Sequence, residues 1–143
     1  MKKKVFEYID AHRDEMTALW REVVNIESGS GNKAGVDAVA ARFRQVIEQT
    51  DGLTRVIEMK YAGNMLIGEF AGAKKDDGVA FMGHMDTVFP DGTVAKRPFS
   101  ISDGKAYGPG VLDMKGGIVA FLYAIKALKS AGYDARPLKI ILA

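Results

Sequence analysis

The sequence predicts a layered α/β domain, and two features lead to that expectation. Val79–Met82 is a short apolar run bounded by turn residues, which is typical of a strand buried on both faces of a sheet, and Leu138–Leu142 is a second candidate for a buried strand. Between them, residues 115–130 carry apolar side chains at helical spacing. A strand, a helix and a second strand in this order make a crossover unit, so both strands should lie in one sheet with the helix packed against it.

Two helices are predicted ahead of this unit, over residues 4–26 and 33–49. In each, apolar side chains recur on one face with charged residues between them. A loop rich in serine and glycine separates the two helices, and Gly52 follows the second. His12 lies among charged neighbours on the first helix, so we expect it to pack or to face solvent.

The remaining segments complete the predicted order of elements. Residues 53–60 and 64–70 have strand character and are joined closely, which favours a hairpin. Residues 91–103 are expected to be irregular, because charged residues are scattered through them without a helical or strand period. The helix at 115–130 should end at Gly132. No linker, repeat or second domain is indicated.

The composition excludes several classes of protein. The 143 residues carry a net charge of +2, which is too balanced to favour binding to nucleic acid or to an anionic membrane. The basic start is followed by charged residues where a signal peptide would be apolar, and no apolar stretch approaches the length of a membrane span. Cysteine is absent, which fits a reducing compartment, so we expect a cytoplasmic protein.

Three polar residues stand where a sheet of this kind places its ligand site. His84 and Asp86 follow the apolar run at Val79–Met82, and Asp113 lies in a glycine-rich segment just before a helix. Residues two apart in an extended segment point the same way, so His84 and Asp86 can face one site. Without cysteine, any metal must be held by imidazole and carboxylate groups, which suit zinc, cobalt or manganese.

A structural interpretation of the same residues stays open at this point. Asp113 could simply cap the following helix, where a negative charge is favoured by about 0.3–1 kcal/mol. Lys115 could neutralise a carboxylate or face solvent. Asp86 could act from behind His84, holding the imidazole in one tautomer without a bond to the metal.

Two ordered motifs resemble those of a known family. Gly-His-Met-Asp-Thr-Val at 83–88, followed by Gly-Pro-Gly-Val-Leu-Asp-Met-Lys-Gly-Gly at 108–117, is similar to the co-catalytic zinc exopeptidase and deacylase family. That family includes glutamate carboxypeptidase, acetylornithine deacetylase, succinyl-diaminopimelate desuccinylase, aminoacylase and peptidase T. The likeness covers nearly the whole chain, and residues 93–99 and 104–110 look closest to the glutamate carboxypeptidase branch.

The resemblance implies a role for each of the three residues. His84 would be a terminal ligand of one zinc ion and Asp113 would bridge two zinc ions, with cobalt or manganese as possible replacements. Asp86 would be the catalytic residue that orients His84 through a hydrogen bond. The resemblance also implies a cis peptide bond between Asp113 and Met114.

The resemblance further implies a layered α/β/α catalytic domain with a mixed sheet. Residues 1–143 would be the N-terminal part of that domain, without the lid and dimerisation domain. The family places a Glu-Glu pair just after the strand that corresponds to Leu138–Leu142, the first glutamate being the general base and the second a zinc ligand. That pair is not within residues 1–143, so we expect this stretch to be inactive alone. We also expect its last strand to lack neighbours and to promote self-association.

For the complete protein, the resemblance implies metal-dependent hydrolysis of an amide bond in a small peptide or an N-acyl amino acid. A carboxypeptidase that releases a C-terminal glutamate-type residue is the first expectation, and a homodimer is compatible with it. A deacetylase or desuccinylase of the same family is an alternative. A non-catalytic association module is a third, although such a module would not need His84, Asp86 and Asp113.

Overall fold

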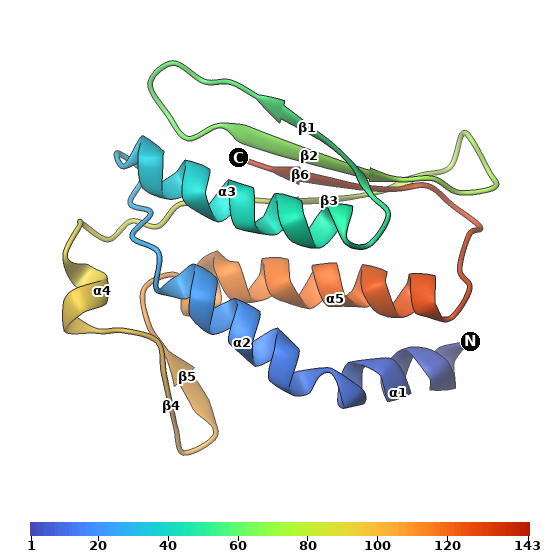
Figure 1. Cartoon of the computed structure of the whole chain (residues 1–143), viewed down its shortest axis with the longest axis horizontal. Helices are drawn as coiled ribbons and strands as arrows, with labels where there is room; N and C mark the ends of the chain where they lie inside the picture. Colours follow the sequence, from blue (N-terminus) through green and yellow to red (C-terminus); the bar gives the residue numbers. More distant parts are fainter.

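The computed structural model describes residues 1–143 and contains a four-stranded sheet with helices on one face (Figure 1). The strands are β1 (Leu53–Ile57), β2 (Met65–Phe70), β3 (Val79–Gly83) and β6 (Leu138–Leu142), in the spatial order β1-β2-β6-β3. β2 runs antiparallel to both β1 and β6, whereas β3 and β6 are parallel. The sheet is therefore mixed, and the α/β class, the hairpin and the crossover unit are confirmed.

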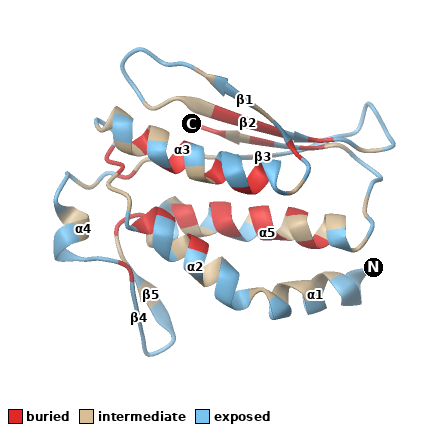
Figure 2. Ribbon diagram, viewed as in Figure 1, coloured by how far each residue is buried: buried red, intermediate tan, exposed pale blue.

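The helices form two tiers beneath the sheet. α3 (Lys33–Glu48) and α5 (Gly116–Ser130) pack against the strands, while α1 (Lys2–Ala11) and α2 (Arg13–Val24) lie on the far side of α5 (Figure 1). The buried residues follow the faces that meet, as Figure 2 shows, because the apolar stripe of each helix is directed at the sheet or at α5. The prediction for α3 and α5 is confirmed, and Gly132 follows the end of α5 with a φ of +79°.

The single helix predicted over 4–26 is broken at His12, so that prediction was wrong in its continuity. His12 has a φ of −112° and a ψ of 18°, outside the helical range, and its ring stacks on Tyr8. The chain changes direction at this break, and both α1 and α2 contact α5 (Figure 1). None of the helices combines the length and the apolar character needed to cross a bilayer.

Two expectations about the buried strands were also wrong. β3 is an edge strand, and the side chain of Met82 is 72% exposed, so β3 is not buried on both faces. β6 does not lack neighbours, because it lies between β2 and β3 with Leu138, Ile140 and Leu142 in the core. The crossover through α5 brings β6 back inside the sheet, which the order of elements along the chain does not reveal.

Residues 91–103 are more regular than predicted. They contain the short helix α4 (Thr93–Lys96) and the strand β4 (Ser100–Ser102), which pairs antiparallel with β5 (Lys105–Tyr107). Asp103 and Gly104 form the turn of this hairpin with φ angles of 51° and 72°. Asp-Gly is a favoured pair for such two-residue hairpin turns, so the dipeptide was a usable signal.

Candidate metal centre

The structure brings His84, Asp86 and Asp113 to one end of the sheet. His84 follows β3 directly, Asp86 lies two residues later, and Asp113 lies in the segment Val111–Lys115 that leads into α5. All three line a cleft of about 290 Å³, together with the backbone around Gly108 and Gly110. Because β3 and β6 are parallel, this is the edge at which both strands finish, where α/β sheets place their sites.

The imidazole of His84 lies between the two carboxylates. Its Nδ1 atom is 3.0 Å from Oδ1 of Asp86, and its Nε2 atom is 2.9 Å from Oδ1 of Asp113. Partial burial lowers the pKa of His84, but the hydrogen bonds to Asp113 and Asp86 outweigh that effect and raise the pKa above its ordinary value. The two carboxylates thus stabilise positive charge at the imidazole, and Nε2 is the nitrogen that faces Asp113.

Asp86 is held through both of its oxygens. Oδ1 meets His84, and Oδ2 accepts a hydrogen bond from the hydroxyl of Ser30, in the loop after α2. That loop runs alongside residues 85–87: the amide of Thr87 donates to the carbonyl of Ser28 at 2.8 Å, and the amide of Ser30 donates to the carbonyl of Thr87 at 3.0 Å. The carboxylate of Asp86 therefore has a fixed orientation behind the imidazole. The sequence indicated only a loop at Ser30, since its partner is 56 residues away.

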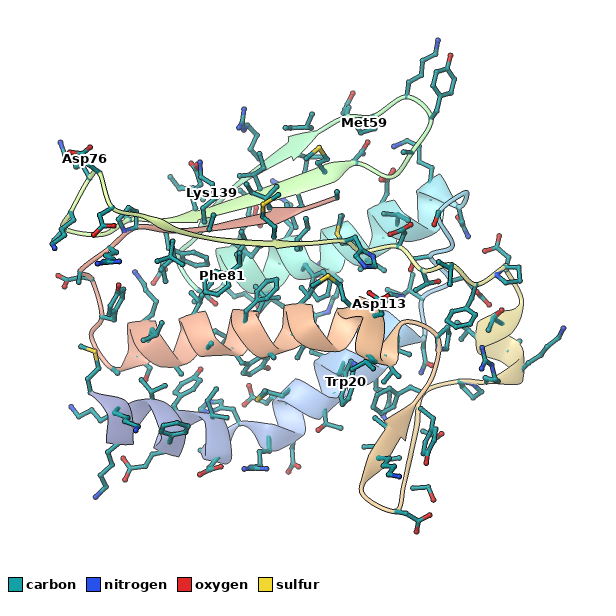
Figure 3. The ribbon with its side chains drawn as sticks, turned by 180° about the vertical axis from the view of Figure 1, so that it is seen from behind. Trp20, Met59, Asp76, Phe81, Asp113 and Lys139 are labelled. Carbon is teal, nitrogen blue, oxygen red and sulfur yellow. The ribbon has the colours of Figure 1, made fainter.

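Asp113 is held differently, because its side chain is 86% exposed and hydrogen-bonds only to His84. Its backbone is not helical, and its peptide bond to Met114 is cis, as the resemblance implies. Gly110 opens the turn with a φ of +71°, and a Cβ atom there would lie 2.5 Å from a methyl carbon of Thr87. Figure 3 shows Asp113 at the start of α5, near Trp20 of α2.

Lys115 neither faces solvent nor pairs with a carboxylate, so both predictions for it were wrong. Its side chain is fully buried, and its ammonium donates to the carbonyls of Val23 at 2.8 Å and Ile26 at 3.0 Å. Burial lowers the pKa of Lys115 to about 8, and the nearby charge of Glu27 opposes that shift.

The donors present fit part of a zinc site. An imidazole nitrogen and a carboxylate oxygen converge on the cleft, with a second carboxylate behind the imidazole, which is the usual support for a histidine ligand. No group of three or more His, Asp or Glu side chains lies close enough to hold an ion completely. A catalytic zinc takes three protein ligands, so these residues alone would not complete such a site.

Comparison with known proteins gives a consistent result. The profile of "Peptidase family M20/M25/M40" matches residues 80–143. Carboxypeptidase G2 of Pseudomonas sp. (strain RS-16) is 38% identical over 128 residues, which is 85% of this chain and 30% of that protein. A succinyl-diaminopimelate desuccinylase of Anaplasma marginale is 44% identical over 54 residues, covering 36% of this chain and 14% of that protein.

The solved structures agree with the sequence matches. Human carnosine dipeptidase 1 superposes with a TM-score of 0.86 at 25% identity, over 98% of this chain and 34% of that one. The fold is thus that of known metallopeptidase structures. Residues 80–143 match Peptidase family M20/M25/M40, and the similarity to carboxypeptidase G2 extends over most of the chain. The chain spans less than a third of the length of the curated relatives given above.

Proposed function

We propose that this chain is the N-terminal part of the catalytic domain of a zinc-dependent amidohydrolase that cleaves small peptides or N-acyl amino acids. The arrangement of His84 carries this proposal. Its Nε2 atom faces Asp113 across 2.9 Å at the cleft, while Asp86 supports Nδ1 from behind. A structural cap at Asp113 would not require an imidazole in that position.

In this proposal, His84 and Asp113 hold the metal and Asp86 keeps His84 in the tautomer that leaves Nε2 free to bind. Two zinc ions in such a site would lower the pKa of a bound water and polarise the scissile carbonyl. The carboxylate of Asp113 is exposed and lines the cleft, and a carboxylate with two oxygens suits a bridging ligand.

The other ligands and the general base would come from further residues of a longer polypeptide. The backbone of Ala143 supports this, because its amide donates to the carbonyl of Gly83 at 3.0 Å and its carbonyl accepts from the amide of Met85 at 2.8 Å. Ala143 therefore lies directly beside His84. Residues that follow it would emerge at the cleft, where an acidic pair could complete the site.

The similarity to carboxypeptidase G2 supports a carboxypeptidase that releases a C-terminal glutamate-type residue, since it extends over 85% of the chain. A desuccinylase or deacetylase is the second candidate, supported by a higher identity over only 36% of the chain. Both reactions use the same metal chemistry, so the binding pocket distinguishes them rather than His84 or Asp113.

The test is metal analysis and a hydrolysis panel on the complete protein. The panel contains an N-acyl glutamate, a β-alanyl dipeptide and an N-succinyl amino acid. We expect zinc to co-purify, the N-acyl glutamate to be the best substrate, and His84→Ala to lose metal and activity together. Full activity in His84→Ala would refute the proposed site, and a folded protein without hydrolysis or bound metal would favour an association module.

Residues 1–143 expressed alone provide a second test. They should show no metal-dependent hydrolysis, because two ligands do not fix a zinc ion. Turnover by this piece at the rate of the complete protein would contradict the proposed division of the site.

A further inference from the structure

Lys115 is the one charged residue whose side chain is fully buried in this chain. Its ammonium has no carboxylate partner, and it donates instead to the carbonyls of Val23 and Ile26. Val23 lies in the last turn of α2 and Ile26 in the loop that follows it, and the dipole of α2 favours a cation at this end. A buried ammonium is costly without such partners, and an apolar residue of the same length would fill the space. The charge at this position therefore calls for an explanation beyond packing.

The position of Asp113 depends on the turn that Lys115 closes. Asp113 has one hydrogen-bond partner and an exposed side chain, so its direction is set by its backbone. The amide of Lys115 donates to the carbonyl of Gly110 at 3.0 Å, which closes the turn around Asp113. The indole of Trp20, on α2, donates to the carbonyl of Val111 at 3.1 Å. The turn is thus attached to α2 at both of its ends, by Trp20 at Val111 and by Lys115 at Val23. Trp20 and Asp113 are labelled in Figure 3.

The end of α2 also supports the other half of the site. The loop that follows it holds Met85 through the hydroxyl of Ser28, at 3.1 Å, and holds Asp86 through the hydroxyl of Ser30. One short stretch of chain, residues 23–30, therefore contacts both motifs. Lys115 is the link between this stretch and the Asp113 turn.

We propose that Lys115 is a positioning residue for the metal centre: by binding the carbonyls of Val23, in the last turn of α2, and of Ile26, in the loop after it, its ammonium fixes the distance between Asp113 and His84. The inference rests on the proposed function, since it assumes that these two residues hold the metal. It adds a role for a residue that does not line the cleft.

The experiment measures Co²⁺ binding to the metal-free complete protein, by titration and by the visible absorption of the bound ion. Lys115→Met keeps the apolar stem and removes the donors. We expect it to bind Co²⁺ about 10–100-fold more weakly, with an altered spectrum, as is usual when a residue supporting a metal ligand is lost. Lys115→Gln keeps an amide donor and should lose less.

Ile125→Ala is the matched control, because Ile125 is fully buried on α5 about 14 Å along the helix from its start. It should lower the midpoint of urea unfolding and leave Co²⁺ binding unchanged. If Lys115→Met does not fold, Lys115→Gln is compared with Ile125→Ala on the same two measurements. Wild-type affinity and spectrum in a folded Lys115 variant would overturn the inference, as would an equal loss of affinity in Ile125→Ala. Failure of the wild-type protein to bind Co²⁺ would instead overturn the proposed function.

Discussion

The two halves of the candidate site are held in place by different means. On one side, side chains hold His84 and Asp86, since Asp86 uses one oxygen for His84 and the other for Ser30. On the other side, Asp113 is almost wholly exposed and takes its position from the backbone of its turn. Loss of a single hydrogen bond should therefore disturb the positions of His84 and Asp86. The position of Asp113 should instead depend on the conformation of its turn.

Removal of Asp113 itself should have the largest effect. In the complete protein, Asp113→Ala should abolish tight metal binding and hydrolysis, because it removes one of the two proposed metal ligands in this region. The unfolding free energy should change by no more than about 0.5 kcal/mol, since the side chain is exposed. Metal analysis measures the loss of bound metal, and urea unfolding measures the change in unfolding free energy. A large loss of stability with metal retained would show that Asp113 is a structural cap.

Asp86→Asn tests the half that side chains hold. The amide keeps the volume of Asp86 but removes the negative charge behind His84, so metal affinity should fall about 10–100-fold while the ligands stay in place. Competition with a chelator measures this change. Unaltered affinity would mean that Asp86 does not support the ligand.

Gly110→Ala tests the half that the backbone holds. A side chain in this left-handed conformation costs about 1–2 kcal/mol, and its Cβ would also meet Thr87. The unfolding free energy should fall by at least that amount, and metal binding should weaken as the turn shifts. Gly31→Ala is the control, because no atom lies within 4 Å of the added carbon and stability should not fall. Equal stability of the two variants would contradict the role given to the turn.

Ser30→Ala should have the smallest effect. It removes one hydrogen bond to Asp86 at an exposed position, so metal affinity should weaken by about 2–10-fold. Ser30→Thr keeps the hydroxyl and should restore most of the loss. A loss of metal affinity as large as that of Asp86→Asn would show that Ser30 contributes as much to the site as the charge of Asp86 does.

The sequence predicted the elements whose cause is local. Helical spacing was sufficient for α3 and α5, and the apolar runs were sufficient for β3 and β6. His84, Asp86 and Asp113 could be selected because their side chains have metal-binding chemistry and because they follow a strand or precede a helix. Their approach to one cleft follows from the parallel pairing of β3 and β6, which the crossover unit implied.

The residues that sequence reasoning missed depend on contacts between distant segments. Lys115 meets Val23 across 92 positions, and Ser30 meets Asp86 across 56. Nothing in their neighbourhood along the chain specifies these partners. The break at His12 was missed for the same reason, because α1 and α2 each contact α5. The β4–β5 hairpin differs, since the dipeptide Asp103-Gly104 was a local signal.

The edge position of β3 has a consequence for work with residues 1–143 in isolation. Val79–Gly83 contains no charged residue or proline, and Met82 is largely exposed, so this border lacks the features that keep natural sheet edges from joining. At high concentration, copies of this stretch should therefore adhere through β3, whereas β6 is shielded on both sides. The substitution Met82→Lys would be the simplest way to keep a preparation of residues 1–143 monodisperse.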